Sequence, residues 1–202
     1  MNPPNKLQPL ILIALLAVAP AAQIAAAGKP QATSAKEQKE QQGSVRISLL
    51  GMQSRVPGSW RAQPPATSSR LAQYSIPGKG AGQEAEFIVY FFGAGQGGSA
   101  NENIIRWRGQ FFGPNGAPVT PRVERFKVNG MAVTTVDLRG AYARGIGIGP
   151  VGVPKADQTL LAAVVESPKG NLIVQLHGPR TTVSAQYSAF MAFLKGLRPA
   201  PG

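Results

Sequence analysis

The segment Ala85-Glu-Phe-Ile-Val-Tyr-Phe-Phe92 decides the fold class, because it is apolar almost throughout. Such a run is typical of a central strand that is covered on both faces. The glycine loop Gly93–Gly98 follows it, and Ser99 with Glu102 then forms the capping-box pattern that begins a helix. We therefore predict a buried strand, a loop and a helix over Ala100–Phe112, in that order.

Hairpin signals surround this unit and indicate an antiparallel sheet. Asn129-Gly130 lies between the alternating segments Pro121–Val128 and Met131–Gly140, and this dipeptide favours a tight turn in which both central residues have positive φ. Gln158–Ser167 and Asn171–His177 form a second predicted hairpin. Shorter strands are predicted at Arg46–Leu50 and Arg70–Ile76, and the turn Val56–Arg61 is expected to bring Trp60 into the core.

Two helices with one apolar face are predicted to cover this sheet. In the first, the inward residues are Ile104, Trp107 and Phe111, or alternatively Ile105 and Phe112. The second is expected to begin at Thr182 as its N-cap, and its apolar positions are Tyr187, Phe190, Met191, Leu194 and Leu197. The predicted fold class is therefore α+β: a mostly antiparallel sheet of about six to seven strands flanked by helices, in a sandwich in which both tryptophans share one core.

This arrangement resembles the PsbP-like fold. The likeness is carried by Val56-Pro-Gly-Ser-Trp60, by the strand that ends in Ile88-Val-Tyr-Phe-Phe92, and by the closing segment Phe193-Leu-Lys-Gly-Leu-Arg198. Phe92–Gly98 followed by Asn103-Ile-Ile-Arg-Trp107 is similar to a segment of uncharacterised exported bacterial proteins of that fold. The resemblance implies an accessory or binding subunit rather than an enzyme.

The first 27 residues have the pattern of a secretory signal peptide. Lys6 precedes the apolar run Leu10–Ala19, and the small residues Ala25-Ala-Ala27 follow. We therefore predict a leader over 1–27, a flexible tether over 28–44 and a single α+β domain over 45–202. The mature protein is expected to be exported, periplasmic or secreted, with no transmembrane anchor after cleavage.

The charge balance favours acidic partners. The whole chain has a formal net charge of +12, and removal of Lys6 with the leader leaves +11. A positive field of this size attracts anionic groups, but it also serves solubility alone. The basic residues are scattered rather than gathered in a run, so no nucleic-acid partner is expected. The absence of cysteine excludes disulfides and thiolate chemistry.

The glycine loop and the helix after it form the best candidate site. Backbone N–H groups at a helix N-terminus attract anions, and side chains with fixed donors follow along the helix. The candidate ligand-binding or partner-binding residues are Gly93, Gly95, Gly97, Gly98, Asn103, Arg106 and Gln110. The loop also matches the spacing of a dinucleotide fingerprint, but the chain lacks the repeated strand–helix–strand context. The simpler interpretation is a turn ahead of a solvated helix.

Catalytic and metal constellations are not evident. His177 is the only histidine, which makes a zinc site implausible, and a hydrogen bond from this strand-end residue to backbone is the simplest expectation. No cofactor and no catalytic residue are predicted. The leading functional hypothesis is an exported, non-catalytic binding or accessory domain for a protein partner or an anionic envelope component. The alternatives are an enzyme of unknown class that uses Gly93–Gly98 and the following helix, and a charge-driven membrane-surface module.

Overall fold

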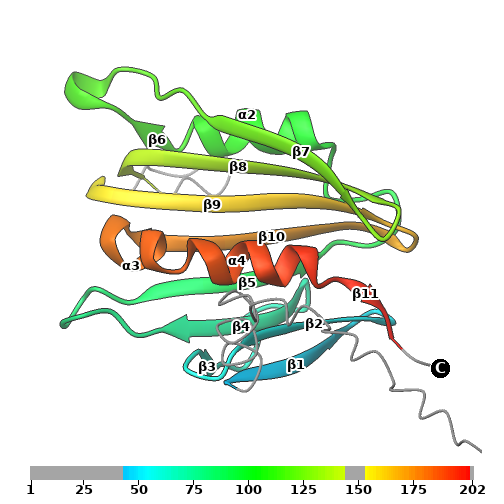
Figure 1. Ribbon diagram of the computed structural model, residues 1–202. Helices are drawn as coiled ribbons and strands as arrows, with labels where there is room; N and C mark the ends of the chain where they lie inside the picture. Colours follow the sequence, from blue (N-terminus) through cyan, green and yellow to red (C-terminus); the bar gives the residue numbers. More distant parts are fainter. Residues whose placement is uncertain (1–42, 144–152, 201–202) are drawn as a thin grey trace, which may run out of the picture.

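A computed structural model describes residues 43–143 and 153–200 (Figure 1). The predicted leader and all but the end of the predicted tether lie outside the described residues. The strands are β1 (Ser44–Leu49), β2 (Met52–Pro57), β3 (Arg61–Ala62), β4 (Arg70–Ile76), β5 (Ala85–Phe91), β6 (Phe111–Phe112), β7 (Arg122–Val128), β8 (Met131–Tyr142), β9 (Lys155–Ser167), β10 (Gly170–Pro179) and β11 (Arg198–Pro199). The helices are α2 (Ala100–Arg108), α3 (Arg180–Ala185) and α4 (Tyr187–Lys195), with a 3-10 turn at Pro114–Gly116.

The strands form two antiparallel sheets, which confirms the predicted α+β class. In the described part of the chain, the large sheet has eight strands in the order β3-β4-β5-β10-β9-β8-β6, with β7 also paired to β8. The small sheet has the order β1-β2-β11. Strand β5 is central, as predicted, and Phe87, Ile88 and Val89 are buried on its two faces.

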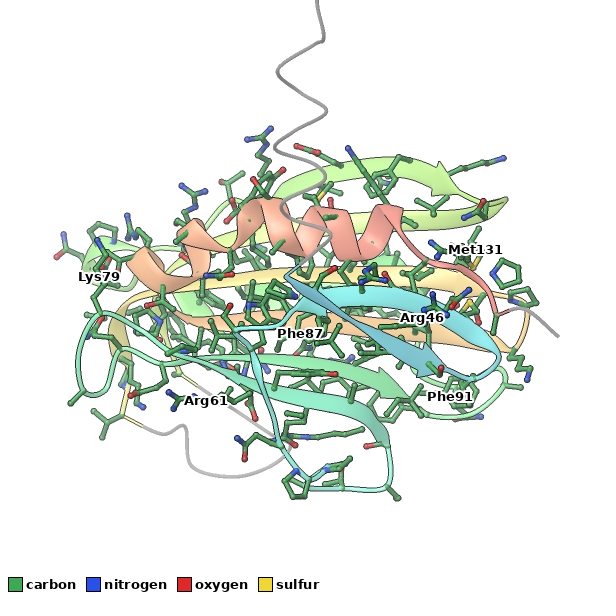
Figure 2. The ribbon with its side chains drawn as sticks, turned by 60° about the horizontal axis from the view of Figure 1, so that its bottom comes forward. Arg46, Arg61, Lys79, Phe87, Phe91 and Met131 are labelled. Carbon is green, nitrogen blue, oxygen red and sulfur yellow. The ribbon has the colours of Figure 1, made fainter. Side chains whose placement is uncertain are left out.

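The large sheet separates two hydrophobic cores, so the prediction of one shared core is wrong. Trp60 and Phe87 pack with Phe190 of α4 on the face that also carries the small sheet. Trp107 of α2 packs with Val164 and other residues on the opposite face. Alternation along the strands divides these sets, because successive side chains point to opposite faces. Figure 1 shows α4 across the front of the sheet and α2 behind it, and Figure 2 shows Phe87 inside the molecule.

Both predicted hairpins are confirmed. Asn129 and Gly130 have φ of 48° and 82°, and Val128 pairs with Met131 across this turn. Ser167 pairs with Gly170 in the second hairpin. Trp60 is buried, as expected, although Val56 belongs to strand β2 rather than to a turn.

The first helix is shorter than predicted. It ends at Arg108 with Gly109 as its C-cap, and Phe111–Phe112 pair with Tyr142 and Ala141 as strand β6. Asn103 and Trp107 form its buried face, while Ile105 is 71% exposed. Gly109 weakens helical continuation, and β-sheet pairing then accounts for the two phenylalanines.

The C-terminal helix is divided in two, and Thr182 is not its N-cap. Helix α3 begins at Arg180, and Gln186 with φ −101° and ψ 4° separates it from α4. The Thr182 hydroxyl donates to the Gln83 carbonyl oxygen at 2.7 Å, which ties the helix to the loop before β5. Tyr187 lies largely at the surface rather than on the inward stripe.

Candidate functional site

One face of the large sheet changes from apolar to polar along its width. Beneath α2, strands β8 and β9 present apolar residues such as Leu138, Leu160 and Ala162. Beyond α2, strands β4, β5 and β10 place polar side chains side by side in register. The three cross-strand rows are Arg70–Tyr90–Ile173, Gln73–Ile88–Gln175 and Ser75–Glu86–His177. Paired residues in adjacent strands lie on one face, so these rows form a largely polar floor that also contains Ile88 and Ile173.

A hollow of about 610 Å³ lies between this floor, α2 and the glycine loop. We call it the arginine hollow. It is lined by Thr67, Ser69, Arg70, Tyr90, Phe92, Gln96, Gly97, Gly98, Arg106, Trp107, Gln110, Tyr142, Ile173 and Gln175. Among the described residues of this lining, the only ionised side chains are the two arginines, one from β4 and one from α2. A ligand pocket generally combines apolar walls with a few convergent polar groups, and this hollow has that composition.

A second hollow of about 560 Å³ continues along the same face. We call it the histidine hollow. Its described lining residues are Gln63, Ser75, Gly82, Glu84, Ala85, Glu86, Tyr142, Val153, Lys155, Gln158, His177, Gly178 and Pro179. Tyr142 lines both hollows, and its ring lies 6.2 Å from that of His177. This second hollow has charges of both signs, unlike the first.

Glu86 connects the two hollows through three side chains. Its Oε1 accepts hydrogen bonds from Arg70 Nη1 at 3.2 Å and from Gln73 Nε2 at 2.8 Å. Its Oε2 lies 3.0 Å from His177 Nε2. The expected backbone partner of His177 is therefore replaced by a carboxylate. Because the Arg70 and Glu86 side chains are only 11% and 26% exposed, this pair is a partly buried ion pair whose members depend on each other.

Three flat side chains stack in a column along the β4–β5 side of the floor, and this column forms one wall of the arginine hollow. The Arg70 guanidinium carbon lies 5.5 Å from the centre of the Tyr90 ring, and Tyr90 stacks on Phe92 at 5.8 Å with an 8° interplanar angle. Phe92 ends the column and is 47% exposed. Gly97 passes close to it: a Cβ there would lie 3.3 Å from Phe92 Cδ2, and φ is +88°. A side chain at Gly97 would therefore disturb both the loop and the wall.

The N-terminus of α2 is already capped by the chain itself. Glu102 Oε2 accepts from the Ser99 backbone N–H at 2.6 Å, and the Ser99 hydroxyl accepts from the Glu102 N–H at 3.2 Å, which confirms the predicted capping box. The pKa of Glu102 lies below its ordinary value, mainly because of the backbone hydrogen bond from Ser99, then the Ser99 side chain and the nearby charge of Arg106. A carboxylate thus already occupies the positive end of the helix.

Asn103 holds the glycine loop against the helix. It is fully buried, and its Nδ2 donates to the carbonyl oxygens of Gly97 at 2.8 Å and Ser99 at 2.9 Å. Its Oδ1 accepts a hydrogen bond from Arg106. Asn171 adds a further tie to the Gly98 carbonyl oxygen at 2.9 Å. These bonds fix the position of Arg106 at the edge of the hollow.

The structure brings together part of the predicted site. Gly97, Gly98, Arg106 and Gln110 line the arginine hollow, and Asn103 supports it from within. Gly93 and Gly95 do not line it; a Cβ at Gly95 would meet nothing within 4 Å.

The floor of the hollow was not predicted from the sequence. Arg70, Tyr90 and Gln175 lie there, on strands whose other positions are mostly apolar. The signal that could have found them is a polar side chain within an otherwise apolar strand, such as Gln175 in Leu172-Ile-Val-Gln-Leu-His177. Such polar side chains are costly to bury unless they form hydrogen bonds.

The described part of the chain contains neither a metal-binding cluster nor a membrane-spanning helix. Over residues 43–143 and 153–200, no group of three or more His, Cys, Asp or Glu side chains is placed to hold a metal ion. Within those same ranges, no helix has both the length and the apolar character needed to span a membrane.

Comparison with known proteins supports the fold assignment. No family model matches the chain, and no curated protein matches its sequence. Among solved structures, cyanobacterial PsbP from Synechocystis is similar over 78% of this chain and 93% of its own, with 13% identity and a TM-score of 0.51. The overall arrangement of this chain thus has a counterpart among solved structures. The fold of this chain is PsbP-like, as the sequence resemblance implied.

Two other solved structures are similar at a lower level. A Pseudomonas aeruginosa protein of unknown function matches over 79% of this chain and 99% of its own, with 16% identity and a TM-score of 0.46. LpqN of Mycobacterium tuberculosis, which is involved in cell envelope biogenesis, matches over 78% and 91%, with 11% identity and a TM-score of 0.46.

Proposed function

We propose that this chain is an exported, non-catalytic accessory domain that binds an acidic group of a protein partner or of an anionic envelope component. The binding site is the arginine hollow. The observation that carries the proposal is the charge of its lining: Arg70 and Arg106 converge on it from two separate elements, and no carboxylate is among its described lining residues. Guanidinium groups bind carboxylates and phosphates through paired donors in a fixed geometry.

The hydrogen bonding of Arg70 supports the same site. Its Nε is buried, and no described residue accepts a hydrogen bond from it. A buried donor without a partner costs about 1–3 kcal/mol. A ligand oxygen that reaches this donor after a small shift of the Arg70 side chain recovers part of that cost.

The ionisable groups of the sheet face are bonded to one another, and this supports a binding role over a catalytic one. The Glu86 carboxylate is shared between Arg70 and His177, so the histidine and the carboxylate are held by each other within the sheet face. Such a network stabilises the shape of the floor and positions Arg70. Of the glycines on which the enzyme alternative rests, Gly97 and Gly98 line the hollow, whereas Gly93 and Gly95 do not.

Export makes a prediction at the N-terminus. When the full chain is produced in a host with a secretory pathway, the mature protein is expected to begin at Gly28 or within a few residues of it, because Ala25 and Ala27 meet the small-residue requirement for cleavage. Mass spectrometry of the extracytoplasmic fraction checks this. Recovery of an intact Met1 in that fraction contradicts it.

The proposed binding site predicts that one arginine of α2 contributes to the affinity for an acidic peptide and that another does not. A hexaglutamate peptide, titrated at low salt, is expected to shift the NMR signals of the residues around the arginine hollow. Arg106→Gln should weaken this binding by at least about tenfold, because one charge-assisted hydrogen bond is worth about 1.5–3 kcal/mol. Arg108→Gln is the matched control: it removes the same charge from the same helix, but Arg108 does not line the hollow. It should change the affinity less than twofold.

The alternative is that basic residues outside the hollow bind the acidic peptide. Arg122, Arg125 and Lys127 lie on strand β7, at the far edge of the large sheet from Arg70. If neutralising these three residues weakens hexaglutamate binding while Arg106→Gln does not, the hollow is not the site. The same outcome with vesicles of anionic lipid would favour the membrane-surface alternative.

A further inference from the structure

One of the two positive charges that line the arginine hollow forms no ion pair with a described residue. Arg70 is paired with Glu86 at 3.2 Å. Arg106 forms no ion pair with any described residue. The Glu102 carboxylate, which is engaged in the cap of α2, interacts with the charge of Arg106 but is not among the described residues that line the hollow. The hollow therefore complements a ligand group with a single negative charge.

A second negative charge on the same ligand group, inside the hollow, meets no compensation. It would have to lose water without gaining a cation, which is unfavourable in a partly enclosed site. Glu86 also lies one side chain behind Arg70 and repels a second charge. These two effects oppose a phosphate dianion more strongly than a carboxylate.

The uncharged residues that line the hollow indicate what kind of molecule carries this negative charge. Tyr90 and Phe92 form a stacked wall, Trp107 lies in the side formed by α2, and Ile173 is in the floor. Flat aromatic rings favour offset stacking with another flat group. The carboxamides of Gln96 and Gln175 add donors and acceptors at the margins.

We infer that the arginine hollow selects a monocarboxylate carried on a flat, apolar body, and discriminates against a phosphate dianion of the same shape. This inference rests on the proposed function and specifies the ligand class of the same site. The carboxylate has two sources, a free organic acid or the chain end of a partner protein, and the two are distinguished by experiment.

The test uses three small probes that share a phenyl ring and a one-atom link to the polar group: phenylacetate, phenyl phosphate and phenylacetamide. The chain has two tryptophans, so Trp60→Phe leaves Trp107, which lines the hollow, as the only tryptophan, and selective excitation separates its emission from that of the tyrosines. At about pH 7.5, a phosphate monoester carries close to two negative charges. Phenylacetate should then bind at least about tenfold more tightly than either of the other two probes. Its fluorescence change should be lost in the added variant Arg106→Gln and retained in Arg108→Gln.

Glu86→Gln provides the sharper test, because it removes the counter-ion of Arg70. Two unbalanced guanidinium charges then line the hollow, and the preference should invert so that phenyl phosphate binds more tightly than phenylacetate. Thermal unfolding of this variant checks that it is folded. If it is not, the comparison of the three probes in the parent protein still decides the inference.

The outcomes separate this inference from the proposed function. If phenyl phosphate binds more tightly to the parent protein and Arg106→Gln abolishes its binding, the arginine hollow is still a site for acidic groups, and the inference of a single-charge preference is wrong. If no probe depends on Arg106, both fail. A peptide ending in phenylalanine, compared as the free acid and as the C-terminal amide, identifies the source: tighter binding of the free-acid peptide than of phenylacetate supports a partner's chain end, and weaker binding supports a free acid.

Discussion

Trp60→Ala and Trp107→Ala are each expected to lower the free energy of unfolding by about 3–5 kcal/mol. Trp60 is 5% exposed and Trp107 is 3% exposed, and each is the largest side chain of its core. Trp60 also packs against Phe87 at 4.8 Å and donates from Nε1 to Gln186 Oε1 at 3.0 Å. Urea unfolding, followed by circular dichroism, measures both values.

The two losses are expected to add. Because the large sheet separates the two cores, the tryptophans share no side-chain neighbours in either hydrophobic cluster. Distant substitutions add to within about 0.3–0.5 kcal/mol. A coupling energy well above that range in the double variant would contradict the division into two cores. Trp60→Phe and Trp107→Phe are the matched controls, and each should cost clearly less than the alanine substitution.

The strands and hairpins could be predicted because their signals are local. Strand β5 is apolar at nearly every position, and Asn129-Gly130 supplies the backbone conformation that its turn needs. The capping box at Ser99 and Glu102 is also a local pattern and sets the start of α2. In each case, the residues that determine the structure lie within a few positions of it.

The features that could not be predicted depend on contacts between distant residues. Strand β11 joins the small sheet through Gln53 and Arg198, at opposite ends of the domain. Phe111 and Phe112 continue the helical apolar pattern, but pairing with strand β8 makes them a strand. No local pattern distinguishes these outcomes, because a short apolar run fits either structure.

The candidate site was half predictable for the same reason. Arg106 and Gln110 follow a glycine loop on one helix, so their proximity is visible in the sequence. Arg70 and Gln175 come from strands separated by about half of the chain and meet the helix only through sheet register. The sequence also does not show how much of the sheet face α2 leaves uncovered, and that uncovered part forms the hollow.

Asn103→Ala is expected to lower the free energy of unfolding by about 2–3 kcal/mol, since two hydrogen bonds of about 1 kcal/mol each are lost and the Gly97 carbonyl oxygen loses its donor. Hexaglutamate binding should also weaken severalfold, because Arg106 loses the acceptor that holds it at the edge of the hollow. Urea unfolding and the NMR titration measure the two effects separately.

Asn101→Ala is the matched control, because Asn101 lies exposed on the same helix and should change stability by no more than about 0.5 kcal/mol. Asn103→Asp keeps the size of the side chain but removes the amide donors, and it places a carboxylate oxygen against the Gly97 and Ser99 carbonyl oxygens. It should therefore destabilise at least as much as alanine. If Asn103→Asp were as stable as the parent protein, the loop would not be held by these hydrogen bonds. If Asn103→Ala weakened stability but not binding, Arg106 would be positioned by the helix alone.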